Sequence, residues 1–170
     1  CLSRGLGDVY KRQSAYVLMS VQMKWRKQVM KIIKITTDNE VSVHELPEGN
    51  YSEQNEVLAD LIGPKCRLCE HVMPNRLYKE LGGPNKVGNI KGNCVSMLID
   101  EDGLHHDLDV NYVGSFLYET DKHGNPIVGD ILIVGEVWTG DGIDFCGMSE
   151  QQFNLLYPKL EELTKKVREM

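Results

Sequence analysis

The sequence of 170 residues lacks any apolar run long enough to span a bilayer, and no segment has the apolar core of a secretory signal. Cysteine is sparse as well: apart from Cys1, the chain has Cys66, Cys69, Cys94 and Cys146. Without a secretory segment, these cysteines are expected to be reduced thiols. We therefore expect a cytoplasmic location and no association with a membrane.

Basic residues are scarce after residue 30. Six of the 19 basic residues and one of the 25 acidic residues precede it, which leaves 13 basic and 24 acidic residues and a net charge of −11. Such a surface repels phosphate backbones, so we expect no direct binding to a nucleic-acid backbone. An acidic protein can still compete for the DNA-binding surface of another protein.

The first 29 residues differ in character from the rest. Residues 7–13 (GDVYKRQ) resemble a translated sequencing adapter, because GATGTGTATAAGAGACAG encodes DVYKRQ. The codons TGG-AGG-AAA for residues 25–27 would place a ribosome-binding site just upstream of Met30. We predict that residues 1–29 are a non-native or read-through tail and that Met30 is the start. The alternative is an added strand at residues 15–21.

Residues 30–170 have the length of one domain, and their hydrophobic pattern predicts a single small α+β domain with a mixed or antiparallel sheet. Alternation predicts an N-terminal hairpin. A helix is expected after it, with Ser52 as its N-cap and Gly63 as the residue that ends it. A C-terminal amphipathic helix begins after Ser149, and Pro158 is expected to kink it or to start a second helix. The predicted strands are 31–36, 41–45, 66–72, the start of NCVSMLIDEDGL (93–104) before its tight Asp-Gly turn, and PIVGDILIVGE (126–136) as a buried strand.

The stretch KCRLCEHV raises the possibility of a metal site at Cys66, Cys69 and His71. In an extended strand, positions i and i+3 lie roughly 10 Å apart on opposite faces, whereas two thiolates on one zinc lie within about 4 Å of each other. The chain has no second C-x-x-C, and CRLC lacks the Gly or Asn of a typical turn. We predict buried strand thiols, no metal and no cofactor.

Residues 99–111 contain acidic residues in a spacing like that of a calcium loop. The final glutamate is missing and the glycine comes too early, which favours a solvated turn. His105 and His106 would point to opposite faces of an extended chain, so at most one could join a given site. The sequence does not establish a catalytic triad or a carboxylate pair by spacing alone.

Residues 75–93 bring together several cations and glycines in an otherwise acidic chain. A glycine-rich loop flanked by cations can hold a phosphate or a carboxylate, although this segment does not match a P-loop. The alternative is a surface loop whose glycines only serve turns. The candidate ligand-binding residues are Asn75, Arg76, Lys86, Gly88, Lys91 and Asn111.

Five stretches together carry a family resemblance: the opening hairpin, IDEDGL, the segment at Asn111, PIVGDILIVGE with Gly129 and Gly135, and the final helix after GIDFCGMSEQQF. They resemble a domain of unknown function common in phage, plasmid and conjugative-element genes of Gram-positive bacteria. The resemblance implies an α+β fold without an assigned activity. The family has an Asn-Arg pair after the acidic turn, whereas Tyr112 follows Asn111 here and an Asn-Arg pair occurs earlier, at Asn75 and Arg76. Two alignments therefore compete, and residues 75–93 resemble an insertion.

These observations predict a non-enzymatic accessory protein of a mobile element that binds a host protein or a small anionic ligand, for example to counter a defence system. One alternative is an acidic decoy that occupies a nucleic-acid-binding surface. Another is an enzyme with a pocket near Asn111, His105 or His106 and the glycine-rich loop.

Overall fold

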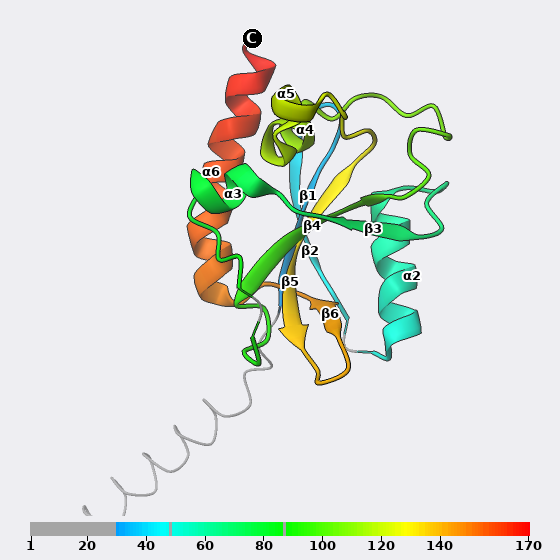
Figure 1. The fold of residues 1–170 in the computed structure, drawn as a ribbon, viewed down its shortest axis with the longest axis vertical. Helices are drawn as coiled ribbons and strands as arrows, with labels where there is room; N and C mark the ends of the chain where they lie inside the picture. The colour runs from blue at the N-terminus through cyan, green and yellow to red at the C-terminus, as the bar shows by residue number, and fades with distance from the viewer. Residues whose placement is uncertain (1–29, 48, 87) are drawn as a thin grey trace, which may run out of the picture.

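The structure is a computed structural model that describes residues 30–47, 49–86 and 88–170. Within these ranges, six strands form one antiparallel sheet, in the order β2-β1-β5-β4-β3 with β6 also paired to β5. Helices cover both faces of the sheet (Figure 1). The predicted single α+β domain is confirmed. The predictions for residues 1–29, including the added strand and the start at Met30, lie outside the described residues.

The N-terminal hairpin follows the alternation of the sequence. Strands β1 (Lys31–Ile35) and β2 (Val41–Glu45) pair with Ile33 opposite Val43. The turn between them contains Asn39 with a positive φ of 62°, a conformation that asparagine tolerates better than most residues. The predicted hairpin is confirmed.

Helix α2 (Tyr51–Ile62) begins one residue before Ser52, which was predicted to be its N-cap. Asn50, not Ser52, is the N-cap, and Asn50 and Glu53 form a reciprocal capping box. Gly63 ends the helix as predicted, and Pro64 follows it.

The remaining elements alternate strands with short helices. The segment after β4 turns repeatedly and leads into α4, which the hydrophobic pattern had not predicted, and strand β6 was also missed. The elements are β3 (Cys69–Val72), α3 (Asn75–Lys79), β4 (Cys94–Asp100), α4 (Tyr112–Tyr118), α5 (Thr120–His123), β5 (Ile131–Trp138), β6 (Ile143–Cys146) and α6 (Glu150–Arg168).

Helix α6 continues through Pro158, so the prediction of a second helix starting there is wrong. Proline removes one backbone donor and would leave the Asn154 carbonyl without its usual partner. Both Asn154 and Pro158 are exposed, so water can take the place of that partner. The N-cap is Ser149 as predicted, and its hydroxyl accepts a hydrogen bond from the Gln152 amide.

The sheet separates two hydrophobic clusters because successive side chains of a strand point to opposite faces. Helices α3, α4 and α6 cover one face and α2 covers the other (Figure 1). The first, larger cluster includes Ile33, Met97, Ile133, Leu117 and Leu156. The second lies under α2 and includes Ile32, Leu58, Leu98, Leu132 and Cys66.

One close backbone contact explains a glycine in the central strand. Strand β1 and strand β6 meet the same edge of β5 in succession, and Lys31 forms a bridge with Met148. At this junction a Cβ on Gly135 would lie 2.4 Å from the Gly147 carbonyl oxygen, too close for any other residue type without a backbone shift.

Candidate functional site

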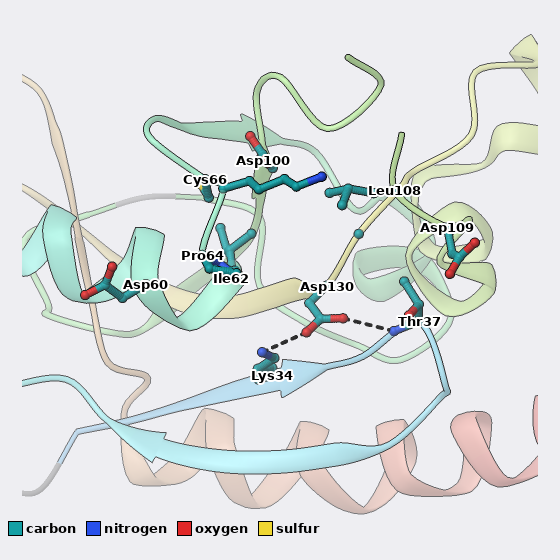
Figure 2. Close-up of a pocket in the computed structure, with 13 residues that line it drawn as sticks. Lys34, Thr37, Asp60, Ile62, Pro64, Cys66, Asp100, Leu108, Asp109 and Asp130 are labelled. Atoms are coloured by element: carbon teal, nitrogen blue, oxygen red, sulfur yellow. Dashed lines mark hydrogen bonds and ion pairs between the residues drawn. The ribbon is translucent and has the colours of Figure 1, made fainter. Parts of the chain in front are cut away.

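A cleft opens at the C-terminal end of α2, between this helix, the β1–β2 turn and the segment that follows β4 (Figure 2). Its volume is about 340 Å³, at the small end of the range for small-molecule sites. The lining residues are Lys34, Thr37, Asp60, Ile62, Gly63, Pro64, Lys65, Cys66, Asp100, Leu108, Asp109, Gly129 and Asp130.

Lys34 and Asp130 form a fixed pair on one wall of the cleft (Figure 2). The Lys34 ammonium lies 2.7 Å from Asp130 Oδ2 and donates a hydrogen bond of 2.6 Å to the carbonyl of Leu61 in the last turn of α2. Asp130 Oδ1 accepts a hydrogen bond of 3.1 Å from the Thr37 amide. Alternation places Lys34 on the α2 side of β1 and Ile33 and Ile35 on the other side.

Asp100 and His106 form a second pair at the cleft. Asp100 ends β4, and its carboxylate is 2% exposed and lies 2.7 Å from His106 Nδ1. The Asp102 amide donates to the other carboxylate oxygen at 3.0 Å. The imidazole is 24% exposed, so Asp100 orients a ring whose other edge is accessible. Of His105 and His106, of which at most one was expected to join a given site, it is His106 that pairs with a residue of the cleft lining.

The chain bends at Leu68, so Cys66 precedes the strand and only Cys69 belongs to β3. The prediction that residues 66–72 form one strand with the two sulfurs on opposite faces is therefore wrong. The Cys66 amide donates to the carbonyl of Gly63, the Cys66 side chain belongs to the cluster under α2, and Cys69 packs against that cluster.

Burial, together with the neighbouring Cys69 and Asp100, raises the pKa of the Cys66 thiol to about 12. Burial also raises the pKa of Cys69. Both thiols are thus protonated at neutral pH. In the described ranges, no group of three or more His, Cys, Asp and Glu residues is placed to hold a metal ion.

A further polar cluster lies on the same face of the sheet, beyond Leu98. Glu136 on β5 is buried and forms an ion pair of 3.1 Å with His71 on β3, whose ring packs edge-on against Phe145. Burial raises the pKa of Glu136, but the pairing with His71 and the nearby Ser96 and Cys94 side chains outweigh it and leave the pKa below the ordinary value. Sequence analysis missed this pair because its members are 65 positions apart.

Asn75 and Arg76 begin α3, and the Arg76 side chain is occupied by contacts within the fold. Its guanidinium donates to the carbonyl of Phe116 at 3.0 Å and to Asp121 Oδ2 at 2.7 Å, and it stacks over the Phe116 ring. It also forms an ion pair of 3.3 Å with Glu80. These contacts attach α3 to α4 and α5.

Asn111 is fully buried and organises the backbone around it. Its Oδ1 accepts a hydrogen bond of 2.8 Å from the Gly114 amide and caps α4. Its Nδ2 donates to the carbonyls of Ile35 and Gly129. Every polar atom of the side chain therefore has a partner inside the protein.

Lys86, Gly88 and Lys91 are exposed and lie at the opposite end of the sheet from Asn111. The Gly88 carbonyl accepts a hydrogen bond from the amide of Trp138, the last residue of β5, whereas Asn111 contacts Gly129 just before β5 begins. A strand of this length spans about 23 Å. The structure thus does not bring the six predicted ligand-binding residues together, and a pocket joining Asn111 to the glycine-rich loop is ruled out. Residues 75–93 also contribute to the first cluster through Leu77 and Leu81.

No family model, curated protein or solved structure matches this chain. None of the helices in the described part of the chain is both long and apolar enough to cross a membrane.

Proposed function

We propose that this chain is a non-catalytic binding protein whose cleft at the end of α2 takes a small ligand with an amine or guanidine group on an aliphatic body. The supporting observation is the charge of the lining, which has four carboxylates and two ammonium groups. Both ammonium groups already have partners: Lys34 binds Asp130, and Lys65 donates to the carbonyl of His106 at 3.2 Å.

The helix adds to this preference for a cation. The C-terminus of α2 lies at the cleft, where the aligned peptide dipoles present partial negative charge. Asp60 and Asp109 lie on opposite sides of the cleft and are exposed, with Asp130 between them (Figure 2). A ligand cation can therefore approach a carboxylate without first displacing a lysine.

The walls suit an aliphatic body. Ile62, Pro64 and Leu108 contribute apolar surface between the charged groups. Burial of each methylene contributes about 0.8 kcal/mol, so a chain of a few carbons adds affinity that a bare ammonium ion lacks. The preferred ligand class is a short alkyl amine or guanidine.

Binding fits the cleft better than catalysis. Among the described lining residues, Cys66 supplies the thiol, and its raised pKa keeps it protonated and a poor nucleophile. His106 has an orienting carboxylate in Asp100, but the Cys66 thiol donates to the carbonyl of Leu68 at 3.6 Å. The cleft therefore combines the histidine with a thiol that is not activated as a nucleophile.

The test uses putrescine as the ligand and 1,4-butanediol as its uncharged counterpart, with isothermal titration calorimetry as the measurement. Putrescine should bind and butanediol should not. Neutralising the exposed carboxylates in Asp60→Asn/Asp109→Asn should weaken putrescine binding about five-fold, since an exposed ion pair contributes up to about 1 kcal/mol.

The control variant Asp141→Asn/Asp144→Asn changes the net charge equally but lies at the β5–β6 turn and on β6. It should bind putrescine as the unchanged protein does. Equal weakening in both double variants would mean that only overall charge attracts the ligand, and it would refute the cleft as the site.

An accessory role in a mobile element stays a prediction, because it depends on the family resemblance alone. A small anionic ligand at the glycine-rich loop is less well supported than a cation in the cleft, since Arg76 is engaged with Asp121 and Phe116. A host-protein partner remains compatible with either ligand.

A second candidate is the acidic decoy, which gains support from the α2 side of the molecule. Glu53, Glu56 and Asp60 lie on α2, and none of these carboxylates forms an ion pair within the described ranges. In the segment that follows β4 and leads to the cleft, Glu101, Asp102, Asp107 and Asp109 also lack such a pair within the described ranges. A decoy would bind a basic DNA-binding domain in competition with duplex DNA, with affinity that falls steeply as salt rises. Affinity independent of salt would count against this candidate.

A further inference from the structure

We propose that the ligand of the cleft is a zwitterion, with an amine at one end of its aliphatic chain and a carboxylate at the other. The amine faces Asp60 and Asp109, and the carboxylate binds the Lys65 ammonium. This inference rests on the proposed function and deepens it, because it names a second charged group of the same ligand. The supporting observation is that the two lysines of the lining differ in how their charge is balanced.

Lys34 is balanced by a carboxylate. Its ammonium lies 2.7 Å from Asp130 Oδ2 and also donates to the carbonyl of Leu61 at 2.6 Å. The Thr37 amide donates to the other oxygen of Asp130 and holds that carboxylate in place. A ligand carboxylate would have to compete with Asp130 for this lysine. Lys34 is therefore part of the wall and is not the group that binds a ligand anion.

Lys65 has no such counter-ion. It is exposed, and its ammonium donates to the carbonyl of His106 at 3.2 Å. Among the residues that the structure describes, it forms no ion pair with a carboxylate. A backbone carbonyl is a neutral acceptor, so the positive charge remains available to an anion. A carboxylate would form a charge-assisted hydrogen bond with Lys65, which is stronger than the bond to the carbonyl.

Asp100 is the carboxylate beside His106, and both of its oxygens are already engaged. Oδ2 lies 2.7 Å from His106 Nδ1, and Oδ1 accepts a hydrogen bond of 3.0 Å from the Asp102 amide. Its charge is thus balanced by a group other than Lys65. In the view of Figure 2, Asp100 lies at the top of the cleft and Asp60 lies below it. The cleft therefore has a cationic end at Lys65 and an anionic end at the exposed carboxylates.

An aliphatic chain with opposite charges at its two ends matches this order. Its methylenes would contact Ile62 and Leu108, which contribute apolar surface to the lining. Putrescine places a second ammonium at the Lys65 end, where like charges repel. The compound 5-aminopentanoate has the same four methylenes and replaces that ammonium with a carboxylate. The preferred ligand class is therefore an ω-amino acid rather than a diamine.

Isothermal titration calorimetry of the full chain with 5-aminopentanoate and with putrescine tests this inference. The amino acid should bind about five-fold more tightly than putrescine, as expected for one exposed ion pair gained. Lys65→Met keeps an aliphatic side chain but removes the charge. It should weaken 5-aminopentanoate binding about five-fold and leave putrescine binding unchanged or stronger. Lys65→Arg, which retains the charge, should keep the preference for the amino acid.

Arg67→Met is the matched control. It removes one positive charge from an exposed side chain two positions away that does not line the cleft. This variant should retain the preference for 5-aminopentanoate. Equal loss of the preference in Arg67→Met and Lys65→Met would mean that overall charge decides the affinity, and it would refute Lys65 as the carboxylate-binding group.

The outcome for putrescine separates this inference from the proposed function. Putrescine binding with no preference for 5-aminopentanoate, or a preference that Lys65→Met leaves intact, would overturn the second charged group and still support an amine site. Absence of binding by both compounds would refute the proposed function and the zwitterion together.

Discussion

The two faces of the sheet differ in what they bury. The face under α3, α4 and α6 packs aliphatic and aromatic side chains, and its charges form pairs at the margin, such as Lys79 with Glu119 and Lys166 with Glu162. The face under α2 buries Asp100 and Glu136 together with the thiols of Cys66 and Cys94, and Cys69 is half-buried beside them. Helix α2 covers this second face, and a cleft opens where that helix ends.

This difference concerns the cost of burying polar groups. Burying a polar group costs free energy unless it has a partner, so a face selected only for stability would resemble the first. The second face retains ionisable groups, each with a specific partner: Asp100 with His106 and Glu136 with His71. We therefore expect substitutions on the first face to change stability and substitutions on the second to change pH response or binding.

The largest expected effect is on the first face. Ile133 is fully buried in the central strand, and Ile133→Ala should destabilise the protein by about 3 kcal/mol through lost burial and a residual cavity. Urea denaturation followed by circular dichroism measures the change. Val43→Ala on the exposed side of β2 is the control and should cost less than about 0.5 kcal/mol. A similar loss in both would contradict the assignment of the core.

Asn111 tests whether a buried polar residue can be purely structural. Asn111→Ala removes the cap of α4 and two further hydrogen bonds, and it should cost about 2 to 3 kcal/mol. Asn111→Asp keeps the capping oxygen but loses both donated hydrogen bonds. Thermal unfolding should therefore show both variants to be destabilised. A stable Asn111→Ala variant with altered ligand binding would instead favour the site predicted from the sequence.

Glu136 should give the second face a distinct response to acid. Because its pKa is lowered in the folded state, the pairing with His71 stabilises the protein above the ordinary glutamate value of 4.5, and this contribution is lost as the pH falls through the folded pKa. Urea midpoints between pH 7 and pH 3 should therefore fall less steeply in Glu136→Gln.

Glu162→Gln is the matched control for that titration. A hydrogen bond from Lys166 also lowers the pKa of Glu162, but this pair is exposed on α6 and contributes little. Its acid profile should follow that of the unchanged protein. Equal acid profiles for Glu136→Gln and Glu162→Gln would mean that the two faces of the sheet do not differ in their response to acid.

The smallest effect is expected at the glycine-rich loop. Lys86→Ala/Lys91→Ala should change stability by less than about 0.5 kcal/mol, because both side chains are exposed. Putrescine affinity should not fall either, since neither lysine lines the cleft. A rise in melting temperature with a nucleotide, abolished by this double variant, would support the anionic ligand instead.

Sequence periodicity identified the elements whose pattern is local. The hairpin, the end of α2 at Gly63, the cap at Ser149 and the buried strand β5 all follow from alternation, helical spacing or a terminal residue. It failed at residues 66–68, where a bend set by hydrogen bonds to Gly63 and Glu101 overrides the apparent strand. It also missed β6, whose four residues carry too little pattern to be recognised.

The candidate site was the least predictable part. Asn111 and Arg76 were selected by residue type and by the composition of their surroundings, yet their polar atoms serve contacts 18 to 76 positions away. The lining of the cleft comes from four separate segments between Lys34 and Asp130. No short motif connects those segments.

The sequence by itself determined the acidic charge, the one-domain α+β class and most helix and strand positions, because these depend on composition and on neighbours along the chain. The tertiary structure alone decided that the chain bends at Leu68 between Cys66 and Cys69, that His106 rather than His105 pairs with Asp100, and that the carboxylates of distant segments share a cleft. Such pairings depend on register and on bends, and both are set by long-range hydrogen bonds and burial.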